Sequence, residues 1–186
     1  MVVLGDSLSA GYGLAGTDAF PAKLARALKA KGITVDITNA GVSGDTMSGG
    51  LGRLDWSVPD GTEAVIVQLG ANDALRGVDP KVTRAALDKI LTRLKARNIE
   101  VLIAGMLAPR NLGADYSRGF DAMYPELAKK HDALLYPFFL EGVATLAKLN
   151  LRDGIHPNAA GVDIIVKRIL PKVEELITRV RTKSRS

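Results

Sequence analysis

Short apolar segments alternate with longer segments of helical periodicity along most of this chain, and this alternation constrains the fold more than any other feature. The apolar segments are MVVL (1–4), TVDIT (34–38), AVIVQLG (64–70), VLIAG (101–105) and ALLYPF (133–138). Apolar residues recur about every 3.6 residues in the segments 20–32, 80–98, 117–132 and 158–180. Alternating strands and helices form βαβ units, and several of these strands are too apolar for one face to lie in water. We therefore expect an α/β protein, a flavodoxin-like three-layer α/β/α sandwich with a five-stranded parallel sheet.

Prolines and glycines mark the expected ends of the helices. Pro80 stands where a first-turn proline belongs, and Gly32 stands where a helix ends. Pro171 lies inside the last helical segment. Because proline lacks the N–H of a helix hydrogen bond, it should kink or divide that helix.

The chain length of 186 residues suits one domain, which we expect to span residues 1–180. The formal net charge is +5, and Arg179, Arg181, Lys183 and Arg185 all lie near the end of the chain. The body is therefore close to neutral, and no nucleic-acid partner is expected. Residues 181–186 are expected to form a basic, frayed C-terminal tail.

Neither a membrane span nor a disulfide framework is expected. No segment reaches the roughly 20 consecutive apolar residues that cross a bilayer. The chain has no cysteine, which excludes disulfides and thiolate metal sites. No signal peptide is visible, and the first strand starts almost at Met1, as it would if an export signal had been removed. The sequence predicts no particular oligomeric state.

Polar, glycine-rich segments follow the predicted strands. They are GDS (5–7), NAGVSGDT (39–46), GANDALRG (70–77) and, at the start of the last helix, RDGIHPN (152–158). The carboxyl ends of parallel strands meet at one edge of a sheet, where ligands bind. We therefore expect these four segments to form one site.

The residues in these segments are those that ester hydrolysis requires. Ser7 carries a hydroxyl that becomes a nucleophile only when a base takes its proton, and His156, one of two histidines, is the candidate base. Asp153, three residues earlier, can accept a hydrogen bond from the ring, which fixes its tautomer and stabilises the imidazolium. A tetrahedral oxyanion needs preorganised donors. The candidates are the backbone N–H groups of Ser7 and Gly44 and the side-chain amide of Asn72.

Each of these residues also has a simpler structural interpretation. Ser7 alone can cap the following helix, Asn72 alone can be a turn residue, and DGIHPN alone can be a turn before a helix. Taken together, in the order Ser, Gly, Asn and Asp-x-x-His after successive elements, they favour a catalytic site.

Other polar residues near these segments are assigned structural roles. Asp6 is expected to be a hydrogen-bonded turn acid, Asp73 to brace the third loop, and Asp45 with Thr46 to cap a helix. His131 is expected at a helix end, where it complements the helix dipole. No clustered His and Asp spacing predicts a metal site and no cofactor is expected, so activity should be insensitive to chelators.

The four polar segments resemble the sequence blocks of the SGNH hydrolases, the GDSL esterase/lipase superfamily. GDSLSAGYG resembles the first block, NAGVSGDT the second, LGANDALRG the third and DGIHPN the fifth. The residues of these blocks are similar to those of the bacterial arylesterase/acyl-CoA thioesterase/lysophospholipase group, and the resemblance extends over nearly the whole chain. The resemblance implies Ser7 as nucleophile, His156 as base, Asp153 as its orienting acid, and an oxyanion hole of Ser7, Gly44 and Asn72. It also implies a periplasmic or secreted location.

The predicted function is that of a serine hydrolase that cleaves small-molecule carboxylic esters and acyl thioesters through an acyl-enzyme. A carbohydrate O-acetylesterase would use the same machinery on a different leaving group. A non-catalytic lipid- or glycan-binding protein of this fold would require the loss of a triad member, and none is missing. The G-x-S-x-G motif of α/β-hydrolases is absent around Ser7, and no phosphate-binding glycine loop with Lys-Ser/Thr is present, which disfavours a nucleotide-binding protein.

Two loops are candidates for substrate selection. The segment 106–120 follows the fourth predicted strand, and the segment 75–80 is expected on the opposite wall of the site. The apolar residues expected to border an acyl chain are Leu75, Leu107, Pro109, Leu112 and Tyr116. Packing against the scaffold would explain the same residues.

Overall fold

The structure, a computed structural model, describes residues 1–183 and contains one five-stranded sheet in the order β2-β1-β3-β4-β5. Every neighbouring pair of strands is parallel. The strands are β1 (Val2–Gly5), β2 (Thr38–Gly41), β3 (Ala64–Gln68), β4 (Glu100–Ala104) and β5 (Leu134–Tyr136). This order is that of a flavodoxin-like doubly wound sheet, so the expected α/β fold is confirmed.

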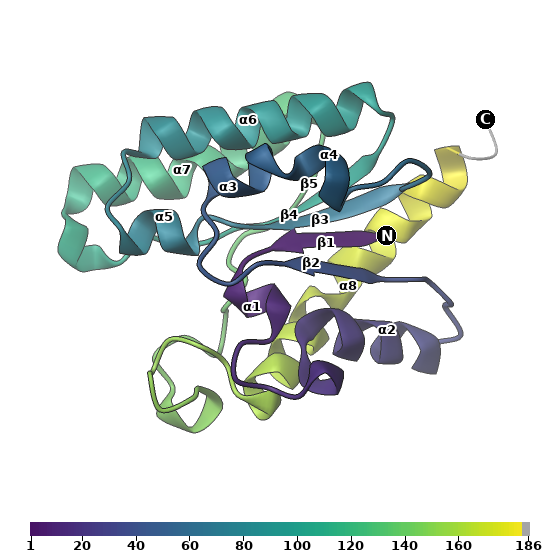
Figure 1. Cartoon of the computed structure of the whole chain (residues 1–186), viewed down its shortest axis with the longest axis horizontal. Coiled ribbons are helices and arrows are strands. Elements are labelled where there is room, and N and C mark those ends of the chain that lie inside the picture. The colour runs from purple at the N-terminus through teal and green to yellow at the C-terminus, as the bar shows by residue number, and fades with distance from the viewer. Residues whose placement is uncertain (184–186) are drawn as a thin grey trace.

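Helices cover both faces of the sheet (Figure 1). On one side lie α3 (Met47–Gly52), α4 (Leu54–Ser57), α6 (Pro80–Ala96) and α7 (Ala114–His131), and on the other lie α2 (Phe20–Ala30) and α8 (Ala159–Lys183). Two short helices, α1 (Ser7–Ala10) and α5 (Ala71–Leu75), follow the carboxyl ends of β1 and β3. Single 3-10 turns occur at Gly16–Asp18, Arg110–Leu112 and Ala147–Leu149. Within residues 1–183, no helix combines the length and apolar character needed to cross a bilayer.

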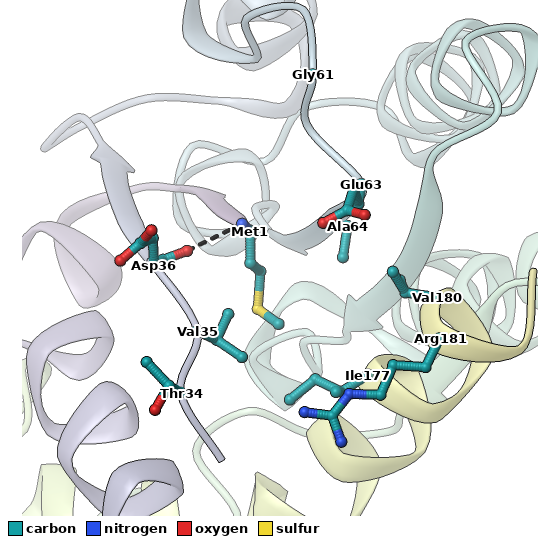
Figure 2. A pocket seen from close by; sticks show the side chains of 10 residues that line it. All are labelled: Met1, Thr34, Val35, Asp36, Gly61, Glu63, Ala64, Ile177, Val180 and Arg181. Atoms are coloured by element: carbon teal, nitrogen blue, oxygen red, sulfur yellow. Dashed lines mark hydrogen bonds between the residues drawn. The ribbon is translucent and has the colours of Figure 1, made fainter. Parts of the chain in front are cut away.

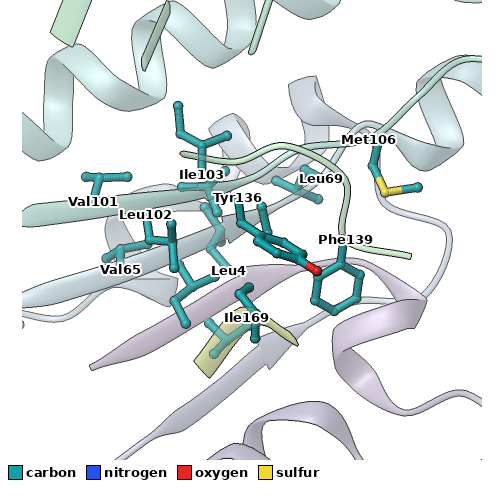
Figure 3. Close-up of a cluster of buried hydrophobic side chains, with 14 of the residues drawn as sticks. Leu4, Val65, Leu69, Val101, Leu102, Ile103, Met106, Tyr136, Phe139 and Ile169 are labelled. Carbon is teal, nitrogen blue, oxygen red and sulfur yellow. The ribbon is translucent and has the colours of Figure 1, made fainter. Parts of the chain in front are cut away.

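The core is built on the central strands. Every residue of β1 and of β3 is buried, as expected for parallel strands covered on both faces. Side chains from the strands, from the segments after them and from α8 interlock in this layer (Figure 3). Those labelled include Leu4, Val65, Leu102, Phe139 and Ile169. A close-packed centre of this kind fixes where the strands end, and hence where the polar segments begin.

The second strand lies later in the chain than predicted. The pattern in TVDIT predicts a strand over 34–38, but the observed strand is Thr38–Gly41. Thr38 is in register with Val2 at the start of β1, so residues 34–37 precede the paired ladder. Val35 and Ile37 still pack against the core, which explains the apolar alternation that suggested a strand.

The last helix continues through Pro171 to Lys183, so the expectation that this proline divides it is wrong. Pro171 is exposed, and the carbonyl group that loses a helix hydrogen bond can therefore face water. The helix also passes residue 180, where the tail was expected to begin. Lys183 donates to the carbonyl oxygen of Asn98 at 3.1 Å and forms an ion pair with Glu100. Residues 184–186 of the expected tail lie outside the described residues.

The other boundaries differ from the expected ones by a few residues. β5 is limited to Leu134–Tyr136, because Pro137 follows and has no N–H for the ladder. α7 begins at Ala114, three residues before the predicted start. The bounds of the short helices α1, α3, α4 and α5 were not predicted, since four to six residues are too few to show a period.

Candidate active site

Three side chains form a continuous hydrogen-bonded chain at the carboxyl edge of the sheet. The His156 Nε2 atom lies 3.0 Å from the Ser7 hydroxyl oxygen, and the His156 Nδ1 atom lies 2.7 Å from Asp153 Oδ2. Ser7 and His156 are separated by 149 positions in sequence. The fold therefore brings these three side chains together in the geometry that nucleophilic catalysis requires.

Local packing fixes the position of Ser7 at the end of β1. Asp6, not Ser7, caps α1, because its Oδ1 atom accepts from the Leu8 N–H at 2.9 Å. The interpretation of Ser7 as a helix cap is therefore wrong, and its side chain is directed to His156. A Cβ atom at Gly41 would overlap the backbone of Ala10, so only glycine allows β2 to approach α1 this closely.

A tight turn holds Asp153 against His156. The Leu151 N–H donates to the His156 carbonyl oxygen at 2.7 Å, and Asp153 Oδ1 accepts from the backbone N–H groups of Ile155 and His156 at 2.9 and 3.0 Å. The His156 and Ile155 N–H groups, followed by the His156 ring, lower the pKa of the Asp153 carboxyl to about 2. The carboxylate is therefore ionised near neutral pH, and it can stabilise an imidazolium beside it.

The Tyr12 ring packs against the His156 ring, and the sequence did not indicate Tyr12 as part of the site. Its ring centroid lies 4.5 Å from that of His156, with the ring planes tilted by 35°. The Tyr12 N–H donates to the Ser7 carbonyl oxygen at 3.1 Å. Its place in GDSLSAGYG, five residues after the serine, was the available signal.

The candidate oxyanion donors come from three segments: Ser7 begins α1, Gly44 lies in the loop after β2, and Asn72 lies in α5. The Asn72 Nδ2 atom donates to the Asp45 carbonyl oxygen at 2.9 Å, which uses one of its two hydrogens. Gly44 has a φ of +82°, and its carbonyl oxygen accepts from Arg76 Nη2 at 2.8 Å. Ser7 and Asn72 line the same cavity. Gly44 does not line it, but the next residue, Asp45, binds Asn72 through its carbonyl oxygen.

The neighbouring acids have structural roles, of which one differs from the prediction. Asp73 is fully buried and accepts from the Met47 N–H at 2.8 Å and the Thr83 hydroxyl at 3.0 Å, so it braces the loop as predicted. Thr46 caps α3, also as predicted. Asp45 does not cap this helix; its carboxylate instead pairs with Arg53 at 2.7 Å.

Two further predictions concern Asp6 and His131. Asp6 is fully buried, and burial raises the pKa of its carboxyl to about 6, although the Leu8 N–H and the nearby Gln68 amide act in the opposite direction. It is a hydrogen-bonded turn acid, as expected. His131 ends α7, where its ring contacts Asp88 Oδ1 at 2.5 Å.

A mainly apolar cavity of about 460 Å³ opens beside Ser7 and His156. Leu75, Leu107 and Pro109 line it, as predicted. Met106 and Ile155, which lie in segments predicted to form the site, also line it. Further lining residues that the sequence did not indicate include Phe138, Leu140 and Ala144, which follow β5.

Leu112 and Tyr116, also predicted as substrate contacts, are not among the residues that line this cavity. The Tyr116 hydroxyl donates to the Val78 carbonyl oxygen at 2.8 Å, and its ring stacks on Phe120. Tyr116 therefore fixes the backbone of the 75–80 segment through Val78. Leu112 lies in the Arg110–Leu112 turn, of which Arg110 lines the cavity and Leu112 does not.

A larger cavity, of about 670 Å³, lies at the opposite end of the sheet (Figure 2). It is lined by residues at the amino ends of β1 and β3 and the end of α8, among them Met1, Asp36, Glu63 and Arg181. Among the described residues that line it there is no histidine, serine or cysteine. Size alone therefore does not identify the active site, and the arrangement of reactive groups does. Across residues 1–183, no three His, Asp or Glu side chains are grouped as they would be to hold a metal ion.

Comparison with known proteins gives an independent assignment. The model of the GDSL-like Lipase/Acylhydrolase family matches residues 3–164. The "Thioesterase 1/protease 1/lysophospholipase L1" of Escherichia coli is 39% identical over 178 residues, which are 95% of this chain and 84% of that protein. An arylesterase of Vibrio mimicus is 41% identical over 84% of this chain and 79% of its own length. The crystal structure of AlinE4, an SGNH-hydrolase family esterase, is 48% identical with a TM-score of 0.79, covering 94% of each chain. The chain thus belongs to the GDSL-like lipase/acylhydrolase family of SGNH hydrolases.

Proposed function

We propose that this protein is a serine hydrolase that cleaves carboxylic esters and acyl thioesters through an acyl-enzyme on Ser7. The observation that carries the proposal is the Ser7–His156–Asp153 chain, with contacts of 3.0 and 2.7 Å, beside an apolar cavity. The names of the related proteins, thioesterase and arylesterase, support the same class of substrate.

In the first half-reaction, His156 Nε2 accepts the Ser7 hydroxyl proton while the oxygen attacks the acyl carbonyl carbon. The electron pair of the carbonyl bond moves to its oxygen. Asp153 holds the ring in the required tautomer through Nδ1 and stabilises the imidazolium. The tetrahedral intermediate then collapses, and the imidazolium gives its proton to the leaving alkoxide or thiolate.

We expect donors from three segments to stabilise the oxyanion. They are the Ser7 N–H, which is in the first turn of α1 and has no partner within that helix, the Gly44 N–H, and the second hydrogen of the Asn72 amide. Preorganised donors of this kind act on the charge that develops in the transition state. In the second half-reaction a water molecule, deprotonated by His156, attacks the acyl-enzyme, and the acid product leaves as Ser7 recovers its proton.

The apolar cavity favours an acyl chain over a sugar as the group bound beside the nucleophile. Leu75, Leu107 and Pro109 offer no hydrogen bonds from their side chains, whereas recognition of a sugar requires several placed polar groups. The triad acts on the acyl carbonyl alone, so either oxygen or sulfur can serve as the leaving atom.

Labelling with a fluorophosphonate, followed by peptide mass analysis, tests the nucleophile. We expect a single adduct on Ser7, and no adduct and no turnover in Ser7→Ala. Turnover by Ser7→Ala would exclude the mechanism.

A panel of p-nitrophenyl esters, acyl-CoAs, lysophospholipids and acetylated sugars, compared by kcat/KM, tests the substrate class. Exclusive deacetylation of a sugar would show that the protein is a carbohydrate O-acetylesterase instead.

A further inference from the structure

A buried arginine forms hydrogen bonds with the carboxyl ends of β1 and β2, close in sequence to the candidate oxyanion donors. Arg53 stands between α3 and α4 and is only 8% exposed. Its Nη2 atom donates to the Gly5 carbonyl oxygen at 2.8 Å, and its Nη1 atom donates to the Ala40 carbonyl oxygen at 2.8 Å and the Ser57 hydroxyl at 3.0 Å. Its Nε atom donates to Asp45 Oδ2 at 2.7 Å. One guanidinium thus connects the ends of β1 and β2 to the loop that follows β2.

The groups that Arg53 binds lead directly to the three candidate donors. Gly5 ends β1, two residues before Ser7. Asp45 follows Gly44 in the chain, and its carbonyl oxygen accepts from the Asn72 amide at 2.9 Å. The carboxylate and the carbonyl of Asp45 are therefore both engaged, one by Arg53 and one by Asn72.

We propose that Arg53 is a positioning residue for the oxyanion hole, because it sets the spacing of the Ser7, Gly44 and Asn72 donors through Gly5 and Asp45. The inference rests on the proposed function, since the donors matter only if an oxyanion forms. Arg53 touches no reacting atom. Its planar guanidinium directs N–H groups along fixed lines to four separate acceptors, a geometry that the single ammonium of lysine cannot reproduce.

The carboxylate of Asp45 has little freedom to adjust if Arg53 changes. The Arg53 and Asp45 side chains are 10% and 13% exposed, so each needs the other as a charge partner. A Cβ atom at Gly49 would overlap the Asp45 carboxylate, which shows that the carboxylate is pressed against the backbone of α3. A shift of the guanidinium is therefore transmitted to the Asp45 peptide and to Asn72.

The first test compares Arg53→Lys with Arg97→Lys on p-nitrophenyl acetate. Arg97 is the matched control, because its Nη2 atom also donates to a backbone carbonyl, that of Val58 just after α4, at 2.6 Å, but it has no connection to the donors. We expect Arg53→Lys to lower kcat by about 10- to 100-fold with KM changed by less than about threefold, the pattern of a misplaced transition-state contact. The acid side of the pH–rate profile should keep its position, since Ser7, His156 and Asp153 are untouched. Arg97→Lys should keep wild-type kcat.

A double-mutant cycle separates positioning from general loosening of the fold. If Arg53 acts through the donors, Arg53→Lys should cost at least about threefold less in kcat in an Asn72→Ala background than in the wild type. Equal losses in both backgrounds, a wild-type kcat in Arg53→Lys, or an equal loss in Arg97→Lys would each overturn the inference. If Arg53→Lys does not fold by circular dichroism, the same cycle with Asp45→Asn decides in the same way.

The wild-type protein distinguishes failure of this inference from failure of the proposed function. Absence of a fluorophosphonate adduct on Ser7 would refute the proposed function itself. A wild type that is labelled and active, together with an unaffected Arg53→Lys, would refute only the role of Arg53.

Discussion

Replacing Asp6 by asparagine is expected to raise the free energy of unfolding above about pH 6, because this buried carboxylate is costly to ionise. Asp6 is fully buried, and its Oδ2 atom has no hydrogen-bond partner among residues 1–183. Burial raises the pKa of the carboxyl from the ordinary value of 3.8 to about 6. Between about pH 3.8 and about pH 6, the Asp6 carboxyl is therefore protonated in the folded protein and ionised in the unfolded chain.

The size and sign of the effect follow from that difference. One pKa unit corresponds to about 1.4 kcal/mol, so the shift of roughly two units amounts to about 3 kcal/mol as an order of magnitude. Because the folded state binds the extra proton, the wild type loses this stability as the pH rises from about 3.8 to about 6 and does not regain it at higher pH. Below about 3.8 both states are protonated, and the contribution vanishes.

Asparagine keeps the useful contact of Asp6 and removes the charge. Its side-chain oxygen can still accept from the Leu8 N–H and cap α1. Its amide would lie near Gln68, whose Nε2 atom also lacks a partner among the described residues. The Ser9 hydroxyl, which donates to Gln68 Oε1 at 2.7 Å, can equally accept, so Gln68 can turn its oxygen to the new amide.

Urea unfolding of wild type and Asp6→Asn, at several values between about pH 4 and about pH 8, measures the effect as a change in midpoint at constant m-value. We expect the variant to be more stable by up to about 3 kcal/mol at the upper end and nearly equal to wild type at the lower end. Asp79→Asn is the matched control: Asp79 also caps a helix, α6, but is exposed, so the change should stay within about 0.5 kcal/mol throughout. A variant less stable than wild type at the upper end, or a difference independent of pH, would refute the reasoning.

Three further predictions concern the chemistry. Asn72→Ala should lower kcat by about 10²- to 10³-fold, with a smaller change in KM, because the amide acts on developing charge; a wild-type kcat would remove Asn72 from the oxyanion hole. Asp153→Asn should lower kcat by about 10³- to 10⁴-fold by removing the group that orients His156. Since the pKa of Asp153 is about 2, its own titration should not affect the rate near neutral pH, and an unchanged rate in the variant would assign the orienting role to another carboxylate. Leu107→Ala should reduce kcat/KM for long-chain esters while sparing acetate, at about 1–3 kcal/mol per methylene contact, whereas Leu112→Ala, outside the cavity, should leave the chain-length profile unchanged.

The fold class and the identity of the reactive residues could be predicted from the sequence, because both are recorded in short segments. Burial on both faces makes β1 and β3 continuously apolar, and helical packing imposes its own period on α2, α6 and α8. The order of polar segments after these strands predicts that Ser7, Asn72 and His156 lie at one edge of the sheet. The structure brings Ser7, His156 and Asp153 within hydrogen-bond distance, and their catalytic roles stay predictions for the assays above.

Contacts between distant segments were decided only by the tertiary structure. Arg53 binds Gly5, 48 positions earlier in the chain, and nothing in the sequence around either residue indicates the pair. Leu112 and Tyr116 follow β4 as Leu107 does, but whether an apolar side chain faces the cavity depends on the direction of the backbone at each residue. Tyr116 turns instead to the Val78 carbonyl. Local sequence sets which conformations a segment prefers, whereas the partner that a side chain meets depends on how all the layers pack, and that is a property of the whole chain.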